Sequence, residues 1–212
     1  GSPYNDDKKA MAFSDSVQDA SHRAGFFTGR TYQIALRTAL YQVIDSVKDD
    51  ISVAELAKQF PKHWHGKLGA EDFVGTFIPP NVEWLSEFEK FREARVLSRS
   101  SPLPAMVRER MDWEVIREFG MQCRIGRTLE KSGAAACYLS PDLTSKCSKE
   151  ITRKIHELGG SFSNITDDDV LRLIAAICER LRVNGGLYHR FVDAYLEKKG
   201  DTWLFNNRIA SG

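Results

Sequence analysis

Residues 165–182 read ITDDDVLRLIAAICERLR, and this stretch sets the fold class. Thr166 is a good candidate for a helix N-cap, and the three aspartates after it favour the positive end of the helix dipole. Apolar residues recur here at three- and four-residue spacing, as one face of a helix requires: Val170, Leu173, Ile174, Ile177 and Leu181. The stretch therefore predicts an amphipathic helix, which Asn184-Gly185-Gly186 should end.

Helical patterns also flank this stretch. Residues 141–158 predict a helix closed by Gly159-Gly160, and residues 187–198 predict another. The order helix, turn, helix and then a candidate hairpin suits a winged-helix module at residues 167–208, although many helical proteins show this order without binding DNA. The charges of such a wing would be Lys198, Lys199 and Arg208.

The central part of the chain is helical too. Ser52 and Glu55 have the spacing of a capping box, which predicts a short helix through Gln59 that Pro61 ends. Residues 63–75 are expected to form a loop or a broken helix, and Pro79-Pro80 to introduce a helix through Leu97.

A long helix is predicted from Ala105 to Ser132, with Gly120 and Gly126 as candidate interruptions. The whole chain is predicted to be mainly α, a multi-helix domain with minor β. The β content would be an isolated N-terminal strand at residues 8–14 and a possible C-terminal strand or hairpin, with the strand near residues 202–205.

Composition limits the classes of function. The 212 residues carry a net charge of +1, so any attraction to nucleic acid must come from a local patch. The four cysteines form no C-x-x-C pair, which disfavours zinc and favours reduced thiols in the cytoplasm. No apolar run approaches the length of a membrane span, so no membrane partner is expected.

The N-terminal segment has its own pattern. Residues 11–20, MAFSDSVQDA, predict a short strand, a polar turn and then a helix that runs to about Lys48, with a candidate break at residues 25–29. Residues 1–7 are expected to be a disordered lead whose Gly1-Ser2 remains from tag cleavage. An orphan strand also makes a homodimer through its edge a candidate assembly.

These ten residues resemble motif IV of the second RecA-like domain in superfamily 2 DEAD/DEAH-box helicases, in the F-S-D-S-x-Q-D-A form of large bacterial members. Residues 125–133 and 181–189 look more weakly like segments that follow this motif. The resemblance implies a partial RecA-like motor domain at residues 8–50 and a helical insertion or accessory region at residues 51–212. The partners would be DNA or RNA and the remaining domains of the parent helicase.

The other parts of a helicase motor are missing from the sequence. Gly66-Lys67 lacks the flanking residues of a phosphate-binding loop, and Gly126-Arg127 lacks the pattern of the arginine motif. We therefore expect no catalytic residue, no metal site and no cofactor in this chain; ATP and magnesium would belong to the parent protein. His63-Trp64-His65 is expected to have a surface or packing role.

Two groups of residues are candidates for nucleic-acid contact. By position in the motif, Ser14, Asp15, Ser16 and Gln18 would face the nucleic-acid channel, although capping alone explains the two serines. On the predicted helix of residues 105–132, four cations would share one face: Arg117, Arg124, Arg127 and Lys131. The alternative is that these cations pair with Glu114, Glu118 and Glu130 on a solvated face.

Two functions from different classes follow. The first is a non-catalytic fragment of an ATP-dependent helicase that shapes the nucleic-acid channel or gates the motor lobes. The second is a helical protein-interaction module that docks a partner subunit without binding nucleic acid. An exposed apolar patch away from the basic residues would favour the second function.

Overall fold

The computed structural model describes residues 17–79, 86–121 and 128–193, with the side chains of residues 17–28 left out. Within these ranges the chain is mainly α, as predicted, and its only β pairing is an isolated bridge between Met121 and Asn184. The predicted strands at residues 8–14 and 202–205 lie outside the described residues. None of the described helices combines the length and apolar character that crossing a bilayer requires.

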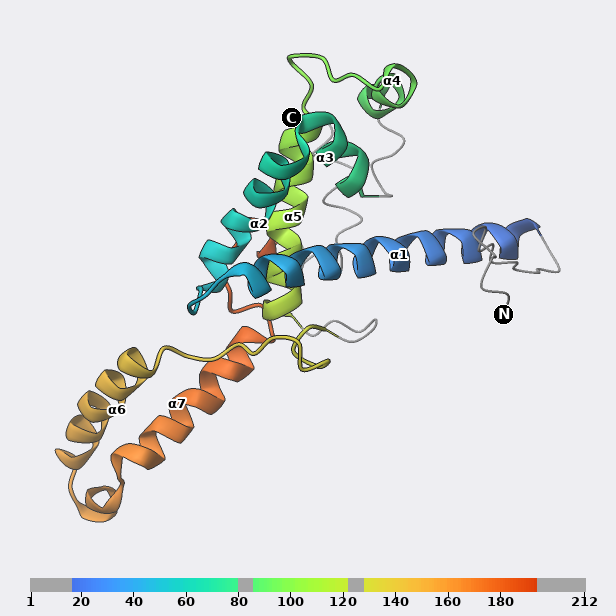
Figure 1. Ribbon diagram of the computed structural model, residues 1–212. Helices are drawn as coiled ribbons and strands as arrows, with labels where there is room; N and C mark the ends of the chain where they lie inside the picture. Colours follow the sequence, from blue (N-terminus) through green and yellow to red (C-terminus); the bar gives the residue numbers. More distant parts are fainter. Residues whose placement is uncertain (1–16, 80–85, 122–127, 194–212) are drawn as a thin grey trace, which may run out of the picture.

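Helix α5, Leu103–Gly120, lies at the centre of the molecule (Figure 1). Its buried residues face all directions around the helix, as expected of a helix enclosed by others. Helix α2, Val53–Leu68, and helix α3, Ala70–Phe77, pack along it and bury Phe60, Phe73 and Phe77. Aromatic rings from α2 and α3 meet in this core, with the Phe73 and Phe77 centroids 5.7 Å apart.

Helix α1, Val17–Ser46, is a single long helix whose C-terminal half joins the same core through Leu36, Leu40 and Val43. The predicted break at residues 25–29 is absent, so the glycines there are accommodated within the helix. Residues on both sides of the predicted domain boundary at residue 50 thus share one hydrophobic core. The N-terminal half of α1 reaches away from the other helices (Figure 1).

The prediction that Pro61 ends the second helix is wrong. Ser52 caps α2 as predicted, since its side chain accepts a hydrogen bond from the Glu55 backbone N–H at 3.1 Å. The helix then continues through Pro61, which is buried beside the core, to Leu68. Gly69 breaks the chain direction with φ of +80°, a conformation that favours glycine, so the predicted broken helix of residues 63–75 is confirmed.

Helix α4, Ser86–Ala94, buries Phe91 and ends three residues before the predicted Leu97. Helix α5 ends at Gly120, one of the two candidate interruptions of the predicted helix from Ala105 to Ser132, and residues 129–132 form a turn rather than helix. Leu187 approaches closely at this point: a Cβ at position 120 would lie 2.8 Å from the Leu187 Cδ1 atom, which favours glycine there. The Gly120 carbonyl also accepts a hydrogen bond from the Gly185 N–H at 3.0 Å.

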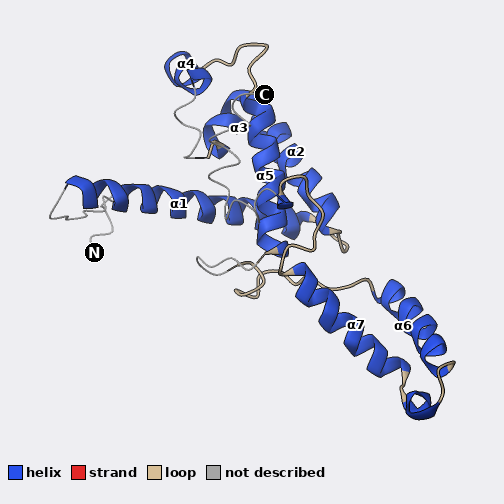
Figure 2. Cartoon of the chain, turned by 180° about the vertical axis from the view of Figure 1, so that it is seen from behind, coloured by secondary structure: helices blue, strands red, loops and turns tan. Residues whose placement is uncertain are grey.

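Helix α6, Pro141–His156, and helix α7, Asp167–Arg182, are joined by the short 3-10 helix of Gly160–Asn164. They form an antiparallel hairpin that projects from the core (Figure 2). Thr166 caps α7 through a complete capping box with Asp169, as the sequence predicts. Residues 187–191 are not helical, which corrects the predicted start of the helix at Leu187; the part of that predicted helix after Asp193 lies outside the described residues.

The segment after α7 returns to the core through His189 and Phe191. The His189 ring lies 5.0 Å from the Trp113 ring, and its Nδ1 atom accepts a hydrogen bond from the Phe191 N–H at 3.1 Å. That acceptor role requires an unprotonated Nδ1. Burial lowers the pKa of His189, and the nearby carboxylate of Asp112 opposes this effect only in part.

We therefore expect the free energy of unfolding to fall as the pH decreases from about 6.5, because the unfolded chain then binds the proton of His189 more readily than the folded chain. Urea unfolding at a series of pH values between about 5 and 8 measures this slope. His189→Asn should flatten it, because the amide oxygen can still accept from Phe191 but cannot titrate. Equal slopes in wild type and His189→Asn would contradict the assignment.

Candidate protein-interaction surface

Most of the predicted nucleic-acid contacts lie outside the described residues: Ser14, Asp15, Ser16, Arg124 and Arg127. Gln18 lies in α1, where the side chain is not described. Arg117 lies on α5, whereas exposed Lys131 lies in a turn after the helix has ended. Arg117 and Lys131 therefore do not share one helical face, which corrects the expected basic stripe.

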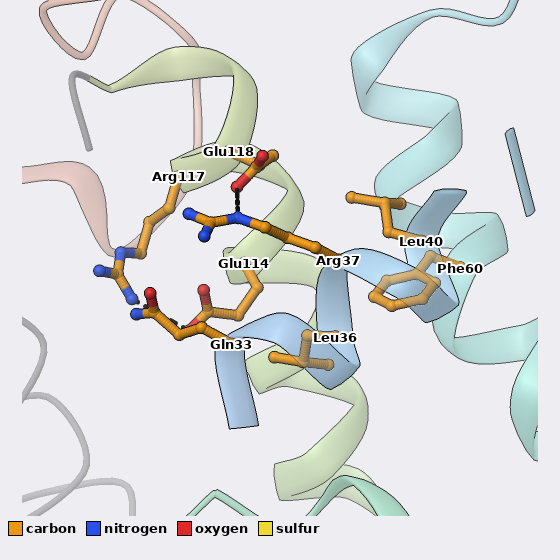
Figure 3. A pocket seen from close by; sticks show the side chains of 8 residues that line it. All are labelled: Gln33, Leu36, Arg37, Leu40, Phe60, Glu114, Arg117 and Glu118. Carbon is orange, nitrogen blue, oxygen red and sulfur yellow. Dashed lines mark hydrogen bonds and ion pairs between the residues drawn. The ribbon is translucent and has the colours of Figure 1, made fainter. Parts of the chain in front are cut away.

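Arg117 forms an ion pair with an acid of its own helix, and a neighbouring ion pair joins α1 to α5 (Figure 3). Its Nη1 atom lies 3.0 Å from Glu114 Oε1, and Arg37 Nε lies 2.9 Å from Glu118 Oε2. The hollow beside them has a volume of about 20 Å³, enough for about one water molecule. The expected pairing with acids therefore holds for Arg117, within α5, and the Arg37–Glu118 pair joins α1 to α5 rather than forming a ligand site.

Another arginine fixes the base of the hairpin. Arg182 donates hydrogen bonds to both carboxylate oxygens of Glu130, at 2.9 and 3.1 Å, and to the Phe119 carbonyl. It also binds Glu179 of its own helix at 2.6 Å, and hydrogen bonding to Glu179 raises the pKa of the guanidinium. The guanidinium therefore has hydrogen-bond partners on both sides and holds α7 to the end of α5.

Beyond this anchor, the hairpin buries few of its own side chains. Ser148 and Thr152 are the buried residues of α6, and Val170 is the buried residue of α7. Three apolar side chains of α7 remain half exposed at four-residue spacing: Leu173 at 56%, Ile177 at 49% and Leu181 at 59%. The sequence pattern indicates these three residues as part of a core face, but no element among the described residues covers them.

Helix α6 presents apolar residues on the same face of the hairpin. Ile151 directly precedes buried Thr152, and in α7 Ile177 directly precedes half-buried Cys178. One residue corresponds to a rotation of about 100° around a helix. Because the two helices are antiparallel, stepping back one residue from the inward position turns Ile151 of α6 and Ile177 of α7 toward the same side of the hairpin. The shared surface, called the hairpin face below, consists of Leu143, Cys147, Ile151, Leu173, Ile177 and Leu181, all exposed.

A separate hollow of about 350 Å³ lies between α7 and the segment that leads into α6. Cys137, Leu171 and Cys178 contribute to its lining, and burial raises the pKa of the Cys137 thiol. Its two charged residues, Glu179 and Arg182, already bind each other. The hollow therefore offers mainly apolar surface and no uncommitted charge for a polar ligand.

The sequence feature that could have predicted the hairpin face is the composition of α6, not that of α7. The inward positions of α6 are small and polar, including Ser145, Ser148 and Thr152. Such a helix cannot cover an apolar stripe as wide as the one on α7. Comparing the two helices, instead of reading each alone, would have predicted an uncovered face.

Within the described ranges, no three side chains of histidine, cysteine, aspartate or glutamate gather in a way that could hold a metal ion. No protein-family model, curated protein or solved structure matches this chain. The geometry of the hairpin therefore carries the functional conclusion.

Proposed function

We propose that this chain is a helical protein-interaction module that docks a partner on the hairpin face. The observation that carries the proposal is the half exposure of Leu173, Ile177 and Leu181 on one stripe of a helix. Apolar side chains that line one face of a projecting hairpin lose contact with water when a partner covers them, and that burial favours association. The four cysteines without a paired motif support a cytoplasmic setting as part of the same proposal.

The physical form of the surface favours a helix as the docked element. Two antiparallel helices leave a shallow groove between them, and an amphipathic helix can place its own apolar stripe along it. The base of the hairpin is fixed by Arg182, so the surface is held in place before a partner arrives. Such preorganisation reduces the ordering cost of binding.

The test is a titration of this chain into a fluorescein-labelled amphipathic helical peptide with leucines on one face and neutral glutamines on the other. Anisotropy should rise to saturation with wild type. Ile177→Asp should weaken binding at least tenfold, because it places an exposed charge in the centre of the apolar contact. The matched control is Val96→Asp, which changes a similarly exposed residue (64%) outside the hairpin and should bind as wild type does.

A second proposal rests on the sequence of residues 11–20: the chain is a non-catalytic part of a superfamily 2 helicase, next to DNA or RNA and the other domains of that protein. Its cofactors, ATP and magnesium, would be held by those other domains. Labelled single-stranded and duplex DNA in the same anisotropy titration decide this proposal. Binding that falls steeply with salt and weakens in Arg124→Ala with Arg127→Ala would support it, and no binding at low salt would count against it.

A further inference from the structure

Charges of opposite sign bracket the exposed stripe of α7. Asp169, Leu173, Ile177 and Arg180 follow one another at spacings of four, four and three residues, so they lie on one side of the helix. Asp169 and Arg180 are both exposed, and eleven residues of helix separate them by roughly 16 Å, about three turns. One side of α7 thus carries an acid toward its N-terminus, two apolar residues in the middle and a base toward its C-terminus.

The order of acid, two apolar residues and base along α7 matches the same order on a second copy of α7 that runs in the opposite direction. The midpoint between Asp169 and Arg180 falls within about half a residue of the midpoint between Leu173 and Ile177. A two-fold axis through that point places the acid of one copy near the base of the other, and Leu173 near Ile177 of the second copy. Such a contact is isologous and therefore closes into a dimer.

The apolar stripe of α6 is centred near the same two-fold axis as the stripe of α7. Both hairpin helices have 16 residues, and the α6 part of the hairpin face is centred on Cys147, near the middle of its helix. One two-fold axis through the middle of the hairpin therefore relates both apolar stripes to their copies. Stacking two such hairpins gives a four-helix arrangement in which neighbouring helices are antiparallel.

We infer that the hairpin face pairs with the hairpin face of a second copy of this chain, with α7 lying antiparallel against α7; this inference rests on the proposed docking function. The contacts available to the charged residues agree with this pairing. Among the described residues Arg180 forms no ion pair, and Asp169 uses only its Oδ2 atom to cap α7. The Oδ1 atom of Asp169 is therefore open to an arginine from a second copy.

The charges also select the orientation. A parallel arrangement would bring Asp169 against its own copy, together with the neighbouring Asp167 and Asp168 at the same tip. Like charges at that distance oppose association, whereas the antiparallel arrangement sets the acidic start of α7 beside Arg180. The macrodipoles of antiparallel helices add to the same preference.

Sedimentation equilibrium of the whole chain over micromolar concentrations tests the pairing. The average mass of wild type should rise from 24.0 kDa toward twice that value. Ile177→Asp should weaken dimerisation about a hundredfold, and Arg180→Glu about tenfold, while Val96→Asp should behave as wild type. A wild-type chain that stays monomeric, or an Ile177→Asp chain that dimerises as wild type does, overturns the inference.

The peptide titration separates this inference from the proposed function. A monomeric chain that binds the neutral amphipathic peptide at Ile177 keeps the docking function and excludes the second copy as its occupant. A chain that neither dimerises nor binds the peptide loses both. Circular dichroism confirms that each variant retains its helical content, so that a loss of association is not a loss of fold.

Disulfide crosslinking tests the orientation. In a mixture of Leu173→Cys and Ile177→Cys chains, the antiparallel arrangement predicts a bridge between positions 173 and 177, identified by peptide mass mapping. A parallel arrangement instead gives bridges from 173 to 173 and from 177 to 177. Dominance of those like-to-like bridges would overturn the antiparallel pairing even if the chain is a dimer.

Discussion

Replacing Glu118 with alanine should lower the free energy of unfolding by about 3–5 kcal/mol, because it leaves a largely buried arginine and a buried backbone N–H without their acceptor. Glu118 is 6% exposed. It accepts hydrogen bonds from Arg37 Nε at 2.9 Å and from the Leu129 N–H at 2.6 Å. The residue thus connects α1, α5 and the turn beyond α5, and its loss is expected to loosen all three.

Urea unfolding followed by circular dichroism measures this loss. Glu118→Gln should cost less, since the amide oxygen can still accept from Leu129. The matched control is Glu150→Ala, which removes an exposed carboxylate bound to Arg153 and should barely change the unfolding midpoint. If Glu118→Ala and Glu150→Ala have similar effects, the connecting role of Glu118 is wrong.

Trp113→Ala should also destabilise the fold by about 3–5 kcal/mol, through the loss of a large buried side chain and the cavity that remains. Trp113 is fully buried on α5 and meets the Phe191 ring at a centroid distance of 6.0 Å in an edge-to-face arrangement. Its removal takes away the surface on which His189 and Phe191 pack. The segment after α7 should therefore lose protection from amide exchange before the rest of the chain does.

The control for Trp113 is an aromatic residue in the same segment. Tyr188 is 94% exposed, so Tyr188→Ala should change the free energy of unfolding by no more than about 0.5 kcal/mol. Urea unfolding of the two variants provides the comparison. A loss below about 1 kcal/mol for Trp113→Ala would mean that this ring does not support the core.

Local signals in the sequence were sufficient for much of the fold. Capping by Ser52 and Thr166 depends on residues within one turn, and both caps form as predicted. Proline was less informative: Pro61 is tolerated inside α2 because burial in the core offsets the missing hydrogen bond. Gly120 is a candidate interruption in the sequence and does end α5, but the close packing of Leu187 against it is a contact between distant residues that no local pattern contains.

The candidate site was harder to predict, for a physical reason. Periodicity shows that Leu173, Ile177 and Leu181 share a face, but burial depends on what another helix brings to that face. Helix α6 brings Ser148 and Thr152, which fill the contact and leave the apolar stripe open. In the same way, the charge spacing offers Glu114 as a partner of Arg117 on a solvated face but does not show that the pair is partly buried.

The hairpin joins the hydrophobic core to the proposed docking surface. Its base is held to the core by Arg182 and by the bridge between Met121 and Asn184, so its apolar stripe is presented at a fixed place. Burying three half-exposed apolar side chains is worth several kcal/mol before the cost of association is subtracted. That gain is the driving force on which docking depends.

The most direct measurement of the central claim is methyl NMR of the isoleucine-labelled chain during titration with the neutral amphipathic peptide. The signals of Ile151 and Ile177 should shift together and saturate, because both lie on the hairpin face. Ile34, an isoleucine on α1 that is 61% exposed, should not shift and serves as the internal control. Unchanged signals for Ile151 and Ile177, or equal shifts for Ile34, would contradict the assignment of the hairpin face as the docking surface.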